Sequence, residues 1–100
     1  MTLEETPGGA PTLCLDEVLN LSAARPLAEA LASTRGGNLD ISAANVRHVG
    51  AQCGQVLVAS LKAWVADGHT LRIVHKTPAF DESVRLLGLK AFFSDGETSQ

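Results

Sequence analysis

The side chains best suited to acid–base, nucleophilic or metal chemistry in this sequence are two cysteines and three histidines. Cys14 and Cys53 lack the close spacing and the histidine neighbours of a metal site, so in a reducing compartment we expect free thiols. His48, His69 and His75 are not spaced from a serine, cysteine or aspartate as in the known catalytic motifs. These residues therefore predict neither a catalytic site nor a metal site.

Two further features have structural explanations. Cys53 falls at the start of a predicted helix, where a thiol pKa can be lowered, but a small buried packing residue is the simpler interpretation. The carboxylates of Asp81 and Glu82 follow Thr77-Pro78, a capping hydroxyl with a proline at the first helical position, and favour the positive end of a helix. No glycine-rich phosphate-binding motif is present. We therefore expect a non-enzymatic protein without a cofactor.

Composition narrows the classes of partner. The sequence has 100 residues, a formal net charge of −3, 45% hydrophobic residues and a mean hydropathy of +0.12. This length fits one domain. The negative net charge and the absence of a dense Lys/Arg cluster argue against a nucleic-acid partner.

No segment predicts membrane insertion or secretion. The longest apolar stretch, residues 56–66, is interrupted by Ser60 and Lys62 and is shorter than the roughly 20 residues needed to span a bilayer. The first residues contain Glu4 and Glu5 where a secretory signal would carry positive charge. We therefore expect a cytoplasmic protein.

Hydrophobic periodicity predicts alternating strands and helices. Alternation predicts strands over 12–15, 39–42 and 70–75, with a short edge strand over 91–93. Helical spacing predicts helices over 22–35, 53–67 and 78–87, the first capped by Ser22. We expect the domain over residues 11–93, with flexible tails over 1–10 and 94–100. The fold class is α/β, with a small mixed, mostly parallel sheet of about four strands and three main helices packed mainly on one face.

The helical stripes predict which residues face the sheet. In the first helix they are Ala24, Leu27, Ala28 and Leu31, and in the second Cys53, Leu57, Leu61 and Trp64. The second helix has further apolar residues on one flank, Val56, Ala59 and Ala63. Either neighbouring elements cover this flank, or it faces a partner protein.

The segment from the central strand to the second helix resembles STAS domains, the family that includes anti-sigma factor antagonists and the regulatory domains of sulphate transporters. The resemblance runs from about Leu13 to Phe93 and includes the closing strand, Ser/Thr-Pro step and helix over 70–89. In that family, the loop before the second helix reads aspartate, then a phosphorylatable serine or threonine, then small residues. The matching positions here are Gly50, Ala51, Gln52 and Cys53. Ala51 is thus a degenerate phosphoacceptor position, because a methyl group cannot carry a phosphoryl group.

The resemblance also implies a function. The amino-acid sequence of residues 19–27, 52–57 and 63–68 is similar to that of small single-domain STAS proteins of bacterial chemotaxis clusters. That similarity implies an adaptor that binds a histidine kinase. The expected partner-binding residues are Gly50, Ala51, Gln52, Gln55, Val56 and Ala59.

Two alternatives stay open. One is an anti-sigma factor antagonist in a partner-switching pathway, with another acceptor such as Ser42 or Thr77. The other is the small cytoplasmic STAS subunit of a lipid or anion transporter that stabilises an ATPase subunit.

Overall fold

The computed structural model describes residues 1–5 and 8–93 and confirms the α/β class. In chain order its elements are β1 (Thr2–Glu4), β2 (Thr12–Cys14), β3 (Val18–Leu19), α1 (Leu21–Ser33), β4 (Leu39–Ser42), β5 (His48–Val49), α2 (Ala51–Ala66), β6 (Leu71–Val74), α3 (Pro78–Leu86) and α4 (Lys90–Phe93).

The main sheet has four strands in the order β1-β2-β4-β6, with β2, β4 and β6 parallel and β1 antiparallel to β2. The mixed, mostly parallel sheet is therefore confirmed. The register aligns Leu13 with Ile41 and Ile41 with Ile73, so one apolar row runs across the three parallel strands. All three side chains are buried beneath the helices.

Strand β1 lies inside the segment that the sequence predicted to be a flexible tail, so that prediction is wrong for residues 2–4. Leu3 pairs with Leu13, and Met1 packs against the core. The Met1 amino group also lies 3.4 Å from a carboxylate oxygen of Asp16. Three residues are too few to show strand periodicity, and this strand forms because β2 offers it an edge.

A second, two-stranded sheet pairs β3 with β5 in parallel, aligning Val18 with His48 and Leu19 with Val49. No strand was predicted at residues 18–19 or 48–49. The small sheet places the residue before α1 next to the residue before α2. Consequently α1 and α2 both begin directly after the two hydrogen-bonded strands of this small sheet.

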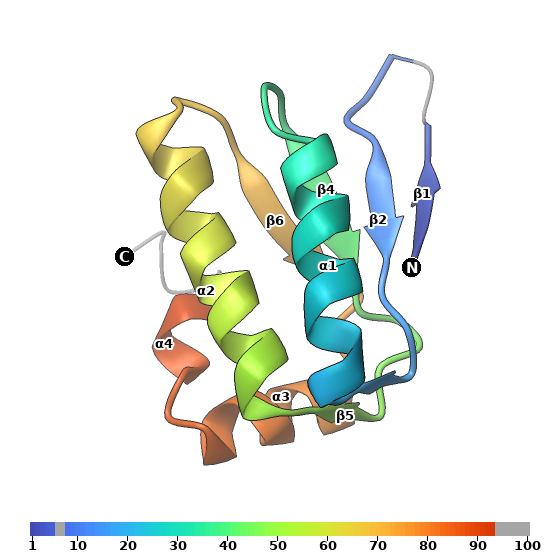
Figure 1. The fold of residues 1–100 in the computed structure, drawn as a ribbon, viewed down its shortest axis with the longest axis vertical. Helices are drawn as coiled ribbons and strands as arrows, with labels where there is room; N and C mark the ends of the chain where they lie inside the picture. Colours follow the sequence, from blue (N-terminus) through green and yellow to red (C-terminus); the bar gives the residue numbers. More distant parts are fainter. Residues whose placement is uncertain (6–7, 94–100) are drawn as a thin grey trace.

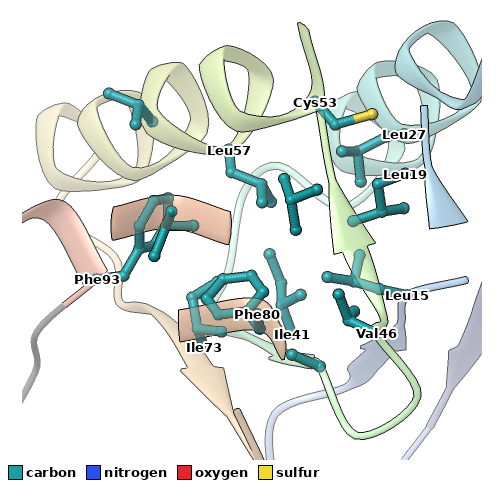
Figure 2. Packing of buried hydrophobic residues seen from close by; sticks show 14 of the residues in the cluster. Leu15, Leu19, Leu27, Ile41, Val46, Cys53, Leu57, Ile73, Phe80 and Phe93 are labelled. Carbon is teal, nitrogen blue, oxygen red and sulfur yellow. The ribbon is translucent and has the colours of Figure 1, made fainter. Parts of the chain in front are cut away.

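Helices α1 and α2 lie side by side across one face of the main sheet (Figure 1). Helix α3 lies at the end of the sheet, where it contacts β5. The prediction of helices mainly on one face therefore holds for α1 and α2, whereas α3 closes the end of the core. Figure 2 shows Phe80 of α3 and Phe93 of α4 entering the same cluster as Ile41, Ile73 and Leu57.

Three predicted boundaries differ from the structure. The N-cap of α1 is Asn20, not Ser22, whose hydroxyl instead donates to the Asn20 side-chain oxygen at 2.8 Å. Residues 91–93 belong to α4 rather than to an edge strand, because Phe93 packs edge-on against Phe80 with ring centroids 5.6 Å apart. Strand β6 ends at Val74, followed by His75 at a φ of 55°. Residues 94–100, predicted to be a tail, lie outside the described residues.

Candidate functional site

Gly50 is the N-cap of α2 and is held tightly against β3. Its N–H donates to the carbonyl oxygen of Leu19 at 2.8 Å, and a Cβ built on Gly50 would lie 3.2 Å from that same oxygen. Its backbone is extended, at φ −83° and ψ 169°, so glycine serves here for close approach and not for a left-handed conformation. No side chain caps the helix at this position.

The first turn of α2 presents small or neutral side chains to solvent. Ala51 and Gln52 are exposed in this turn, and Gln55 is exposed one turn later. No acidic residue lies in the first turn, and Lys62 is the sole charged residue of the helix. Because the first N–H groups of any helix lack intrahelical acceptors, this end offers donors and a partial positive charge to whatever approaches it.

Val56 and Ala59 continue this surface into a groove between α1 and α2. The groove has a volume of about 290 Å³. The residues that line it are Ala28, Leu31, Ala32, Arg35, Val56, Ala59, Ser60, Ala63 and Trp64. Leu31 and Trp64 are buried and form its floor, whereas Ala28, Ala32 and Ala59 are exposed along its walls.

The groove ends at a cluster around Trp64. The Arg35 guanidinium lies over the Trp64 ring, 5.7 Å from its centroid, and one of its terminal nitrogens lies 2.7 Å from a carboxylate oxygen of Asp67. The Trp64 indole nitrogen donates to the Gly37 carbonyl oxygen at 2.8 Å. These contacts fix the C-terminal end of α2 against the turn that follows α1.

Cys53 lies beneath the candidate site rather than on it. Its side chain is fully buried, and its Sγ lies 3.4 Å from the Asn20 carbonyl oxygen, in donor geometry (Figure 2). Burial raises the pKa of the Cys53 thiol. The structure therefore favours the packing interpretation of Cys53 over the redox one.

The two alternative phosphoacceptor hydroxyls are engaged within the fold. Ser42 is buried and accepts a hydrogen bond from the Ala44 N–H at 3.4 Å. Thr77 donates to the Val46 carbonyl oxygen at 2.7 Å and accepts from the Phe80 N–H at 3.0 Å, as the N-cap of α3. Burial shields Ser42, and phosphorylation of Thr77 would remove the proton that it donates to Val46.

The structure thus places the six predicted partner-binding residues along one end and one flank of α2. Sequence reasoning missed the opposite wall of the groove, which α1 supplies through Ala28, Ala32 and Arg35. Ala28 was predicted to face the sheet and is instead exposed. The spacing of Ala28 and Ala32, one helical turn apart, was the available signal for this wall.

Over residues 1–5 and 8–93, no group of three or more His, Cys, Asp or Glu side chains is placed to share a metal ion. Within the same residues, no helix is both long and apolar enough to cross a bilayer.

Comparison with known proteins bears on the family of the chain. No curated protein matches the chain. A family model described as "Mlab, STAS domain" matches residues 2–93, which includes β1, both sheets and all four described helices. The match covers both walls of the groove and the start of α2. The chain therefore belongs to the STAS domain family.

Proposed function

We propose that this chain is a non-enzymatic adaptor that docks onto a histidine kinase of a bacterial chemotaxis system. STAS domains are protein-interaction or regulatory modules and generally not enzymes. The proposed docking surface comprises Gly50, Ala51, Gln52, Gln55, Val56 and Ala59. The observation that carries the proposal is the exposed, uncharged and uncapped start of α2, which continues directly into an apolar groove.

The methyl group of Ala51 determines how such an adaptor would be regulated. A phosphoryl group at this position would add about −1.5 to −2 charges to the middle of the docking surface. Ala51 has no oxygen to accept one, so the surface stays available for docking. Control of the complex then falls to the kinase, for example through its own phosphorylation state.

A second candidate is the small STAS subunit of a lipid or anion transporter, which would stabilise an ATPase subunit. The engaged hydroxyls of Ser42 and Thr77 count against the other alternative, the anti-sigma factor antagonist. Incubation with a kinase and measurement of the intact mass would reveal a phosphoryl group on any other residue.

The test is affinity purification from the native cell, comparing the parent with Ala51→Glu. A glutamate in the first turn of α2 favours the helix by about 0.3–1 kcal/mol, so the variant stays folded while its carboxylate blocks the docking surface. Thr70→Glu is the matched control, because Thr70 is exposed and lies between the C-terminal end of α2 and the start of β6, whereas Ala51 is the first residue of α2.

We expect a histidine kinase to copurify with the parent and with Thr70→Glu, and to be lost with Ala51→Glu. Equal recovery with all three proteins would reject this docking surface. Recovery of a transport ATPase in place of the kinase would select the second candidate.

A further inference from the structure

We infer that the groove between α1 and α2 receives an amphipathic helix of the partner protein, with apolar side chains in the groove and a carboxylate opposite Arg25. This inference rests on the proposed function, because it names the element by which the docked partner is held. It extends the docking surface from α2 onto α1, beyond the six residues named above.

The two walls of the groove are stripes with the spacing of helix–helix contacts. On α1 the lining residues Ala28, Ala32 and Arg35 continue a stripe that begins outside the groove at Leu21 and Arg25. On α2 the lining residues Val56, Ala59 and Ala63 continue a stripe that begins at Gln52. Successive residues are four or three positions apart, as in surfaces that pack against another helix. Three alanines of these walls are exposed, and Leu21 has an exposed fraction of 72%. A third helix could therefore lie along the groove with its backbone close to both walls.

The dimensions of the groove suit one short helix. The lining residues of α1, from Ala28 to Arg35, cover about 10 Å at the helical rise of 1.5 Å per residue, which is about two turns, and Arg25 lies about one turn beyond them. The volume of the groove, about 290 Å³, gives room for a few large apolar side chains above the Leu31 and Trp64 floor. An occupant with apolar residues at positions i, i+3 or i+4, and i+7 would fill it.

Charge indicates what should flank those apolar residues. Arg25 is exposed on α1 about one turn before Ala28, beyond the residues that line the groove, and forms no ion pair with a carboxylate in the described part of the chain. Arg35, at the other end, is already neutralised by Asp67. Glu29 lies four positions after Arg25 on α1 without forming an ion pair with it, and α2 contributes no carboxylate. An Asp or Glu on the occupant would therefore complement Arg25.

The same charge argues against a second copy of this chain as the occupant. A two-fold contact between two such faces would bring both copies of Arg25 toward one interface, without a carboxylate on either stripe to pair with them. A helix from a different protein, with an acidic residue on its rim, avoids this repulsion.

The test uses a photo-crosslinking amino acid, p-benzoylphenylalanine, placed in separate variants at Ala28, at Ala51 and at Thr70 in the native cell. The peptide crosslinked through Ala28 is sequenced, synthesised with a fluorescent label and titrated with the purified chain. We expect an amphipathic helical sequence with an acidic residue. We further expect Arg25→Glu to weaken its binding at least about tenfold, and lysine in place of the peptide's acid to restore binding to that variant.

Lys62→Glu, the same charge reversal on the other flank of α2, is the control and should leave the affinity of the peptide unchanged. Crosslinking at Ala51 without crosslinking at Ala28 would overturn the groove inference and leave the proposed function standing. Absence of crosslinks at both positions would overturn both. Crosslinking of Ala28 to another copy of this chain would overturn the inference in favour of self-association.

Discussion

Trp64 of α2 donates its indole N–H to the carbonyl oxygen of Gly37 at 2.8 Å, across 27 positions of sequence. This bond joins the last turns of α2 to the turn that leads from α1 into β4. The Arg35 guanidinium covers the outer face of the same ring. Trp64 thus forms the floor of the groove together with Leu31 and also connects the end of α2 to the turn after α1.

Replacing this side chain should cost stability without unfolding the domain. We expect Trp64→Phe to lower the free energy of unfolding by about 1–3 kcal/mol, because it removes the bond to Gly37, weakens the Arg35 contact and leaves unfilled volume. Urea titration followed by circular dichroism would measure the change, since Trp64 is the one tryptophan available for fluorescence. A variant as stable as the parent would show that the bond contributes nothing.

Gly50 should be sensitive to even one added methyl group. A Cβ at this position would lie 3.2 Å from the backbone oxygen of Leu19, and alanine is also a poorer N-cap than glycine. We expect Gly50→Ala to lower the free energy of unfolding by about 1 kcal/mol. Gly37→Ala is the matched control, because no atom lies within 4 Å of its added Cβ, and it should be neutral or slightly stabilising. Equal effects at both positions would refute the steric explanation.

The Thr77 hydroxyl should contribute measurably to the free energy of unfolding. Thr77→Val keeps the shape of the side chain but removes both the donation to Val46 and the cap on the Phe80 N–H. We expect a loss of about 1–3 kcal/mol in the free energy of unfolding. Thr77→Ser should recover most of it, because the hydroxyl is restored. If serine lost stability and valine did not, the methyl group rather than the hydroxyl would be the important contact.

The buried thiol of Cys53 should make stability depend on alkaline pH. Its pKa is raised by burial in the folded state, so folding favours the protonated thiol. The resulting stability is fully present below the unfolded pKa, about 8.5, and is lost as pH rises through the folded pKa. We expect the free energy of unfolding to fall above about pH 8.5 in the parent and in Cys14→Ala. Cys53→Ala should lack this component, and an unchanged pH dependence in that variant would assign it to another group.

The parallel strands and the inner helical stripes were predictable because their signals are local. Leu39 and Ile41 alternate with polar residues, and Cys53, Leu57 and Trp64 recur at helical spacing. The helix at residues 90–93 was not predictable from the β-prone pair Phe92-Phe93. Its conformation depends on the contact between Phe93 and Phe80, which is tertiary.

Half of the candidate site could be predicted, and the other half depended on how the helices lie across the sheet. The start of α2 followed from the family resemblance, and Val56 and Ala59 followed from its helical spacing. Ala28 was assigned to the inner face because it adjoins Leu27 in the apolar stripe. In the structure the stripe is centred on Leu27 and Leu31, which leaves Ala28 on the flank next to α2. The role of these residues in binding stays a prediction.

The small β3–β5 sheet has a consequence for the thermodynamics of association. The Gly50 N–H is hydrogen-bonded to the Leu19 carbonyl oxygen, and the Cys53 thiol to the Asn20 carbonyl oxygen. These bonds hold the first turns of α1 and α2 together in the absence of a partner. A surface that is already ordered loses little conformational entropy when it is occupied. The domain would then bind as a rigid template, and any ordering transition, with its heat-capacity signature, would belong to the partner.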